Sequence, residues 1–312
     1  MSQSASPNIL RLGTRGSPLA LAQARMVQSR IAAAQGVEPA RVVIEVIQTS
    51  GDRIKDLPLT DAGGKGLFTK EIEEALAERR IDLAVHSAKD LPTVLPSGLE
   101  LAAFLPREDP RDAFVSLKAK SLLALPPGAR VGTASLRRQA LVRRLRPDLH
   151  VEPMRGNVDT RLRKINDGVA DGTILALAGL KRLGLESKAA SVFEVDEFLP
   201  AVGQGAIAIE IRTDDAATRA AIAATNDLPT GIALAAERAF LAALDGSCRT
   251  PIAGHATVTA NHVRFSGLIV KPDGSELHET TREGSIKVAA ALGADAGREL
   301  RRRGGPDFFA GS

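Results

Sequence analysis

The sequence predicts an α/β protein of more than one domain. Its 312 residues exceed the usual size of a single domain, and 44% of them are hydrophobic, which is enough to fill real cores. Short apolar runs typical of strands alternate with helical patterns, so that the order strand, turn, helix recurs along the chain. Two stretches punctuated by proline, residues 106–111 and 199–205, interrupt this alternation. We expect the chain to cross between domains at these two places.

The first strand-to-helix turn follows a predicted strand at residues 8–12. Ser17 is a good helix N-cap and Pro18 fits the first helical position, and apolar residues then recur at helical spacing. Arg15 therefore stands beside the free backbone N–H groups of a helix start, an arrangement that binds anions. A surface arginine next to an ordinary cap explains the same residues equally well.

A polar, glycine-rich stretch follows the predicted strand at residues 42–48. Residues 49–66 have few apolar anchors and include Lys65 between two glycines. They do not match the Walker phosphate loop, because Gly66 stands where that pattern needs Ser or Thr. A lid over a site and a simple connector are both open readings. Residues 68–79 then predict an amphipathic helix.

Side chains that could bind a ligand or take part in catalysis follow directly after the buried strand predicted at residues 81–85. Ser87, Lys89 and Asp90 come at its carboxyl end, where ligands bind in open α/β sheets. The alternative is a surface ion pair between Lys89 and Asp90, which contributes little to stability. Another strand is predicted at residues 99–105.

The second domain is predicted to begin near Asp112 and repeats the strand-to-helix turn. Strands are predicted at residues 130–132, 151–154 and 174–177. The first leads to the turn that carries Thr133, Ser135, Arg137 and Arg138, the second to Arg155, Asn157 and Arg161, and the third to Arg182. Ser17, Ser135 and Asn157 each combine a capping side chain with a nearby arginine, and arginine suits bidentate recognition of carboxylates. Together they predict a cleft for a ligand with many carboxylates or phosphates.

Residues 206–211 predict a strand after the second crossing, and a last region follows from a helix near residues 230–244. Strands are predicted there at residues 256–259, 263–270 and 276–281, with a closing helix at residues 286–302. Cys248, the only cysteine in the chain, falls on a loop between the first of these helices and the strands. A loop thiol beside Arg249 favours the reactive thiolate, whereas a small buried side chain is the commoner role of a free cysteine.

The amino-acid composition narrows the classes of molecule that this protein could bind. The formal net charge is +4, but residues 130–182 hold twelve Lys and Arg against five Asp and Glu, which suggests an anionic partner. The chain has no Trp or Tyr, so it has few aromatic side chains on which nucleic-acid bases could stack.

The sequence gives no sign of a metal site or a membrane segment. One cysteine and five scattered histidines give no standard zinc site, and we expect no metal. The sequence shows no signal peptide or long apolar span, so we expect a cytoplasmic protein without membrane contact.

These motifs, taken in order, resemble the porphobilinogen deaminase (hydroxymethylbilane synthase) family over almost the whole chain. Any one of them is weak, but their order makes the resemblance very specific. The motifs are residues 13–20 (GTRGSPLA), 63–68 (GGKGLF), 85–90 (VHSAKD), 107–113 (REDPRDA), 135–138 (SLRR), 155–157 (RGN), 199–205 (LPAVGQG) and the cysteine loop 245–251 (DGSCRTP).

The resemblance implies an enzyme of porphyrin (tetrapyrrole and heme) biosynthesis with a dipyrromethane cofactor, bound covalently to Cys248 by a thioether. Such an enzyme condenses four porphobilinogen molecules, releases ammonia at each step and then hydrolyses off hydroxymethylbilane. It implies that Asp90 is the catalytic carboxylate and also contacts the cofactor. The residues implied to hold cofactor carboxylates are Ser87, Lys89, Thr133, Ser135, Arg137 and Arg138. Those implied to bind substrate or the growing chain are Arg15, Ser17, Gln23, Lys65, Arg155, Arg161 and Arg182.

The family's fold implies three α/β domains in a monomer. Residues 1–105 with 200–226 and residues 106–199 would form two lobes like those of periplasmic binding proteins, with a cleft between them. Residues 227–312 would form a small α+β domain with a sheet and helices, and this domain would carry Cys248. Two positions depart from the family pattern: Ala134 replaces a common serine, and Ser247 replaces a common glycine.

Two other functions compete with this enzyme. A non-catalytic two-lobed anion-binding protein explains the arginines and the crossings, but it needs neither a reactive loop cysteine nor Asp90 in a basic site. Nucleic-acid binding by residues 130–182 would give an affinity that falls steeply with salt, and the missing aromatic residues count against it.

Overall fold

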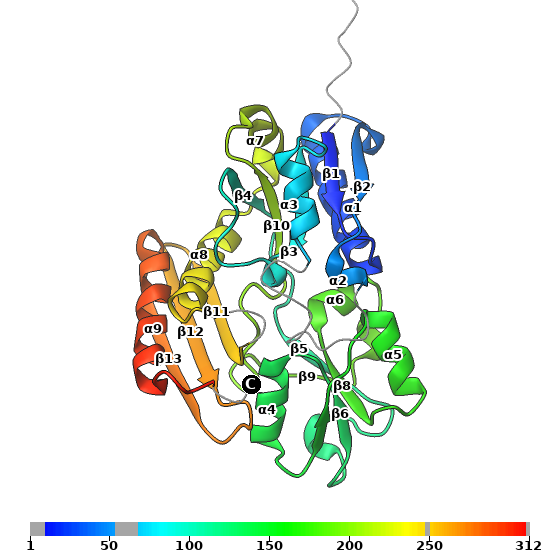
Figure 1. Ribbon diagram of the computed structural model, residues 1–312, viewed down its shortest axis with the longest axis vertical. Helices are drawn as coiled ribbons and strands as arrows, with labels where there is room; N and C mark the ends of the chain where they lie inside the picture. Colours follow the sequence, from blue (N-terminus) through cyan, green and yellow to red (C-terminus); the bar gives the residue numbers. More distant parts are fainter. Residues whose placement is uncertain (1–9, 54–67, 247–249, 310–312) are drawn as a thin grey trace, which may run out of the picture.

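The computed structural model describes residues 10–53, 68–246 and 250–309. Within these ranges the strands form three sheets, which Figure 1 shows as an upper lobe, a lower lobe and a third unit at the side. The predicted α/β class, with two sheet-based lobes and a third small unit that has a sheet and helices, is confirmed.

The sheet of the first lobe has the strand order β2-β1-β3-β10-β4. Strand β1 pairs in parallel with β2 and β3, whereas β10 runs antiparallel to β3 and β4. The helices α1 and α3 cover opposite faces of this sheet, because Val85 packs into the same core cluster as α1 and its neighbour Ala84 packs with α3. The elements are β1 (Leu10–Thr14), α1 (Pro18–Gln35), β2 (Val42–Val46), α2 (Ser50–Arg53), α3 (Lys70–Ala77), β3 (Leu83–Ser87), β4 (Leu99–Phe104), β10 (Ile207–Arg212) and α7 (Ala216–Ile222).

The sheet of the second lobe repeats this arrangement in the order β7-β6-β8-β5-β9. Three parallel strands lie on one side, and β5 runs antiparallel to β8 and β9. The chain enters each lobe's antiparallel strand directly from a crossing: residues 106–111 lead into β5, and residues 199–205 lead back to β10 in the first lobe. The elements are β5 (Asp112–Val115), β6 (Arg130–Gly132), α4 (Leu136–Leu145), β7 (His150–Glu152), α5 (Val158–Asn166), β8 (Gly172–Ala176), α6 (Leu177–Arg182) and β9 (Ser191–Val192).

The third unit is an antiparallel sheet, β11-β12-β13, flanked by two helices. Helices α8 and α9 pack so closely that a Cβ at Gly293 would lie 1.9 Å from the carbonyl oxygen of Ala236. Phe308 is buried in this core and meets Phe309 edge-on, with ring centroids 5.3 Å apart, so the tail aromatics close the unit. The elements are α8 (Leu228–Ala243), β11 (Ile252–Thr259), β12 (His262–Val270), β13 (Leu277–Ser285) and α9 (Ala289–Gly304).

Short 3₁₀ turns join several of these elements. The turn η2 matters most for function, because it follows β3 directly and carries the predicted site residues Lys89 and Asp90. These turns are η1 (Pro39–Arg41), η2 (Ala88–Asp90), η3 (Leu122–Ala124), η4 (Glu186–Lys188), η5 (Ala223–Thr225) and η6 (Ile286–Val288).

The structure contains elements that the sequence patterns did not predict. Strand β5 begins with a charged residue, Asp112, yet all four of its residues are buried. The stretch at residues 178–182, for which the sequence analysis named no element, belongs to helix α6. The stretch expected to be a loop after residue 48 includes the single turn α2, whose Ser50 backbone N–H donates to Glu71 Oε1 at 2.9 Å. Each of these elements is stabilised by tertiary contacts more than by local periodicity.

Candidate active site

The carboxyl end of the first lobe's sheet forms a pocket. Ser17 caps helix α1 by accepting a hydrogen bond from the Ala20 N–H at 3.3 Å, as predicted. Gln23, one turn further along α1, is buried, and its side-chain amide hydrogen-bonds with Ser87 at the end of β3 (Nε2 to Oγ, 2.9 Å). The predicted site residues that line this pocket are Arg15, Ser17, Gln23, Ser87 and Asp90.

Arg15 is held over an aromatic face. Its guanidinium carbon lies 4.2 Å from the centroid of the Phe68 ring, within the range of a cation–π contact. Phe68 lines the same pocket, so a residue that the sequence analysis used as the start of a helix and as part of a family motif also contacts a predicted substrate-binding arginine.

Asp90 is an exposed carboxylate in this pocket, which Arg15 also lines. No other described residue donates a hydrogen bond to it or forms an ion pair with it. A carboxylate without a fixed protein partner is available to a ligand. Because an ionised carboxylate only accepts hydrogen bonds, the ligand would have to offer a donor such as an N–H group.

Lys89 lies beside Asp90 but points toward the second lobe. Its Nζ donates to Oε1 of Gln204 at 3.2 Å. The pKa of the Lys89 ammonium is lowered to about 8, chiefly by burial and next by the positive charge of Arg138, while the negative charges of Asp90 and Asp112 oppose this shift. Lys89 is therefore mostly protonated at neutral pH, and a further downward shift of its pKa would leave it partly deprotonated there.

The second lobe holds a buried clamp of two arginines on one carboxylate. Arg137 Nη2 donates to Asp112 Oδ2 at 2.7 Å, and Arg138 Nη2 donates to Asp112 Oδ1 at 2.6 Å. All three side chains are at least nine-tenths buried. Burial by itself would raise the pKa of Asp112, but the two guanidinium charges and their hydrogen bonds outweigh it and hold this pKa well below its usual range.

This clamp adds a role to Arg137 and Arg138 that the sequence analysis missed. Both were expected to face a bound ligand, yet each is also the partner of Asp112, and each donates to a backbone carbonyl, of Leu199 and Ile174 respectively. Asp112, at the start of β5, was the one residue that could have indicated this pairing. Its position directly after the predicted crossing gave no sign that it is buried. Only the pairing of β5 with β8 brings it under α4.

The predicted caps of α4 and α5 are confirmed. Ser135 Oγ accepts from the Arg138 N–H at 3.4 Å, and Asn157 Oδ1 accepts from the Thr160 N–H at 2.8 Å. Thr133 is fully buried, and its hydroxyl oxygen accepts from the Ser135 N–H at 3.3 Å. Thr133 and Ser135 thus shape the turn at which the helix starts.

The remaining predicted arginines surround the same region. Burial lowers the pKa of the Arg161 guanidinium to about 10, with smaller contributions from the charges of Arg138 and Arg155, so these three cations lie near one another. Arg182 Nη2 donates to the Gly205 carbonyl at 2.6 Å, next to the second crossing. Lys65 and Cys248 lie outside the described residues.

A second buried carboxylate joins the third unit to both crossings. Glu237 of α8 is fully buried and accepts from Arg107 Nη1 at 2.5 Å and from the Gly203 N–H at 2.7 Å. It also accepts from the Ala256 N–H of β11 at 2.8 Å. Burial would raise its pKa, but the Arg107 charge, followed by a hydrogen bond and charge from His255, lowers it to about 2.

The site has the donors that a group with several carboxylates needs. The Nε atoms of Arg137, Arg138 and Arg182 are buried and meet no acceptor in the described part of the protein. Buried N–H donors without acceptors are costly, and carboxylate oxygens would satisfy them. Among the described residues no group of three or more His, Cys, Asp and Glu side chains is arranged to hold a metal ion, and no described helix is both long and apolar enough to cross a membrane.

Comparison with known families identifies this arrangement. Residues 10–220 match the family model described as porphobilinogen deaminase, dipyromethane cofactor binding domain, and residues 232–302 match porphobilinogen deaminase, C-terminal domain. The chain belongs to the porphobilinogen deaminase family. The match supports the enzyme and not the alternative of a non-catalytic anion-binding protein.

Curated relatives agree over nearly the full length. A porphobilinogen deaminase of Nitrobacter winogradskyi is 64% identical over 96% of this chain and 94% of its own. One of Nitrobacter hamburgensis is 62% identical over 99% of this chain and 98% of its own. Among solved structures, a periplasmic substrate-binding protein of an ABC transporter from Coxiella burnetii is 14% identical, with a TM-score of 0.44, over 71% of this chain and 93% of its own.

Proposed function

We propose that this protein is a hydroxymethylbilane synthase of tetrapyrrole biosynthesis. It joins four porphobilinogen molecules head to tail, releases one ammonia at each step, and frees the linear tetrapyrrole hydroxymethylbilane by hydrolysis. The observation that carries the proposal is Asp90, a carboxylate without a partner among the described residues, at the carboxyl end of β3 in the pocket that Arg15 also lines. Membership of the porphobilinogen deaminase family supports it.

When bound, the dipyrromethane cofactor supplies the free pyrrole carbon to which the first substrate unit is joined. We assign its thioether to Cys248. Lys89, Arg137 and Arg138 would hold its acetate and propionate groups, together with the hydroxyl-bearing residues Ser87, Thr133 and Ser135. The buried Nε atoms of Arg137 and Arg138 support this assignment, because carboxylate oxygens would complete their hydrogen bonding.

Asp90 is assigned to the chemical step. The C–N bond of porphobilinogen breaks when the electrons of the pyrrole nitrogen push out ammonia, which leaves a cation spread over the ring and its methylene group. A fixed carboxylate near the ring N–H stabilises this charge as it develops. The exposure of Asp90 leaves it open to an incoming pyrrole ring.

The other arginines are assigned to substrate and to the growing chain. Each pyrrole unit carries two carboxylates, so negative charge accumulates as the chain grows. Arg15, with Ser17 and Gln23, would receive the incoming substrate at the first lobe, and Arg155 and Arg161 would do so at the second. Arg182 would contact the growing chain, and Lys65 would belong to a lid.

The domain boundaries follow as part of this proposal. Residues 1–105 with 200–226 would form the first lobe, residues 106–199 the second, and residues 227–312 the unit that carries the cofactor. The grouping of the strands into three sheets supports these limits. We further propose that the protein acts as a cytoplasmic monomer without nucleic acid, and a single cysteine suits a reducing compartment.

Intact-mass measurement tests the assignment of Cys248. The protein purified from cells should exceed its sequence mass by one linear two-pyrrole unit, and Cys248→Ser should remove the excess together with hydroxymethylbilane formation. Ser247→Ala, a neighbouring substitution, serves as the control and should keep both. An active wild-type preparation with the bare sequence mass would refute the covalent cofactor.

A further inference from the structure

Gln204 lies at the end of the second crossing, between the two lobes. It is fully buried, and the flanking residues Gly203 and Gly205 both have positive φ angles, 75° and 86°. A Cβ at Gly203 would lie 2.9 Å from the backbone nitrogen of Lys89, and one at Gly205 would lie 2.3 Å from the carbonyl oxygen of Glu108. The two glycines therefore let this turn press directly against the backbone of η2 on one side and the first crossing on the other.

The side chain of Gln204 uses both ends of its amide. Oε1 accepts from Lys89 Nζ at 3.2 Å and from Arg138 Nη2 at 3.5 Å. Nε2 donates to the Pro110 carbonyl at 2.8 Å and to Asp112 Oδ1 at 2.8 Å. The reversed amide would aim its N–H groups at two cations and its oxygen at a carboxylate, so the charges around it select this orientation.

We propose that Gln204 is a positioning residue that keeps Lys89 protonated and aimed at the cofactor carboxylates, and that ties η2 of the first lobe to the Asp112 clamp of the second. The inference rests on the proposed function, because Lys89 is assigned there to hold cofactor carboxylates. One amide meets both needs, because its oxygen accepts from the cations and its nitrogen donates to Asp112 and Pro110.

The surroundings of Lys89 show why an acceptor is needed. Arg137 and Arg138 on α4 disfavour its positive charge, while Asp90 on its own turn and Asp112 on β5 favour it. Within the described chain, Gln204 Oε1 is the one hydrogen-bond acceptor of Lys89 Nζ. Because the pKa of Lys89 is already lowered to about 8, losing this acceptor would leave Lys89 partly deprotonated in the working pH range.

Two substitutions separate this role from a merely structural one. Gln204→Met keeps the length and removes the acceptor, so the titration of Lys89 should shift down by about one pH unit. Gln204→Glu keeps an acceptor and adds a negative charge, so the titration should shift up. Gln28→Met is the matched control, because Gln28 Nε2 donates to the Val42 carbonyl of β2 at 2.7 Å and, within the described residues, has no hydrogen bond with Lys89, and it should leave the titration unchanged.

The titration is measured in two ways on the protein as purified. Competitive acetylation of the Lys89 amine across pH, read by peptide mass spectrometry, reports its pKa without reference to activity. The basic limb of kcat/KM for hydroxymethylbilane formation reports the same proton in the working enzyme. Intact mass and thermal unfolding record cofactor loading and folding of each variant.

The positioning role is supported if, in both measurements, the Lys89 titration moves to lower pH in Gln204→Met and to higher pH in Gln204→Glu. If Lys89 titrates as in the wild type in the Met variant, the proposal is overturned, whatever the loss of activity. If the Glu variant fails to fold because of its repulsion with Asp112, the Met variant decides alone, and Gln204→Leu, which also lacks the acceptor, replaces Met if Met fails. A wild type that acetylates as expected but forms no hydroxymethylbilane would refute the proposed function and leave the Lys89 shifts as the test of Gln204.

Discussion

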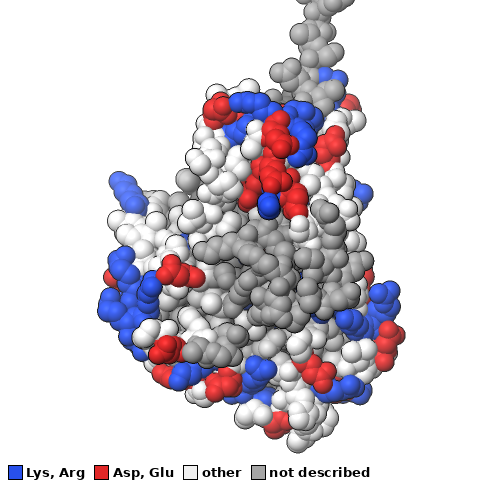
Figure 2. Space-filling model, in the orientation of Figure 1, with Lys and Arg blue, Asp and Glu red and all other residues white. Residues whose placement is uncertain are grey.

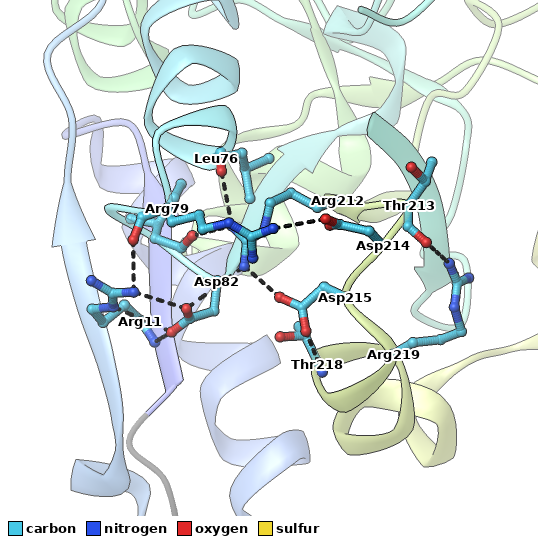
Figure 3. Close-up of polar contacts among 11 residues, drawn as sticks. Arg11, Leu76, Arg79, Asp82, Arg212, Thr213, Asp214, Asp215, Thr218 and Arg219 are labelled. Carbon is cyan, nitrogen blue, oxygen red and sulfur yellow. Dashed lines mark hydrogen bonds and ion pairs between the residues drawn. The ribbon is translucent and has the colours of Figure 1, made fainter. Parts of the chain in front are cut away.

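The two ends of the first lobe's sheet both carry arginine and aspartate, but they use them differently. At the amino ends of β1 and β3, Arg11, Asp82 and Arg212 form the network of polar contacts in Figure 3. At the carboxyl end of β3 lie Lys89 and Asp90. On the face drawn in Figure 2, acidic side chains gather beside basic ones over the upper part of the molecule, where Figure 1 shows α3 and α7.

The network at the amino end is closed. Asp82 accepts from the backbone N–H of Arg11 at 2.8 Å and from its Nη2 at 2.9 Å. Arg212 Nη1 donates to the carbonyls of Leu76 and Ile81 at 2.8 and 2.7 Å, and its Nη2 pairs with Asp215. Both carboxylates, Asp82 and Asp215, have cationic partners here, although Arg212 Nε has no acceptor among the described residues. The network therefore joins β1, α3, β3 and β10 and leaves neither carboxylate free for a ligand.

The carboxyl end is open by contrast. Asp90 lines a pocket there with Arg15, and it has no hydrogen-bond partner among the described residues. The presence of arginine and aspartate therefore does not mark the site. What distinguishes it is a carboxylate that the described part of the protein leaves without a partner, at the sheet edge where ligands bind in α/β folds.

The largest expected effect comes from Asp90. Asp90→Asn keeps the shape and one acceptor but removes the charge, so turnover should fall about 10³-fold with little change in thermal unfolding. Asp90→Glu keeps the charge but displaces it and should lose about 10²-fold. Hydroxymethylbilane formation is measured with Asp82→Asn, at the opposite end of the sheet, as the control with normal turnover. Near-wild-type turnover of Asp90→Asn would remove this residue from the mechanism.

Asp112→Asn tests the buried clamp of Asp112 with Arg137 and Arg138 in the second lobe. The substitution leaves two buried guanidinium groups without a counter-charge, so the free energy of unfolding should fall by about 3–5 kcal/mol. Loading of the cofactor should fall as well, because Arg137 and Arg138 lose their fixed orientation. Denaturant unfolding and intact mass measure the two effects. Unchanged stability would show that the clamp is not formed in solution.

Glu237 predicts an acid-dependent loss of stability. Its pKa in the folded protein lies near 2, below the ordinary value of 4.5. Its contribution, about 3 kcal/mol, is therefore present above pH 4.5 and lost as the pH falls toward 2. Denaturant unfolding between pH 7 and 3 should show a smaller loss in Glu237→Gln than in the wild type, although the variant is less stable at pH 7. Equal pH slopes would contradict the assignment.

Arg11 should give the smallest effect. Its side chain is 41% exposed, and an exposed ion pair contributes about 1 kcal/mol or less. Arg11→Leu should therefore lower the free energy of unfolding only slightly and leave hydroxymethylbilane formation unchanged. A loss of turnover would show that the amino end of the sheet influences the chemistry and would weaken the contrast between the two ends.

Local patterns predicted much of the site. The caps at Ser17, Ser135 and Asn157 were correct because a capping side chain and the helix it starts are neighbours in sequence. Ser87 and Asp90 were placed at a strand end for the same local reason, and the structure brings both into one pocket with Arg15. Their individual roles stay predictions.

The clamp on Asp112 and the contacts of Gln204 could not be predicted in this way. Arg137 and Arg138 lie 25 and 26 residues after Asp112 in the sequence. They meet Asp112 only because β5 enters the second sheet beside β8. Gln204 meets Lys89 across 115 residues, because the turn at residues 203–205 packs against the backbone of η2.

By itself, the sequence determined the α/β class, the helix starts and the chemical types gathered at the strand ends, since these depend on residues a few positions apart. Only the tertiary structure decided which charges are already paired within the protein and which remain for a ligand. That distinction rests on burial and on partners far away in the chain, because a charge removed from water needs a partner and the fold alone determines which residue provides it.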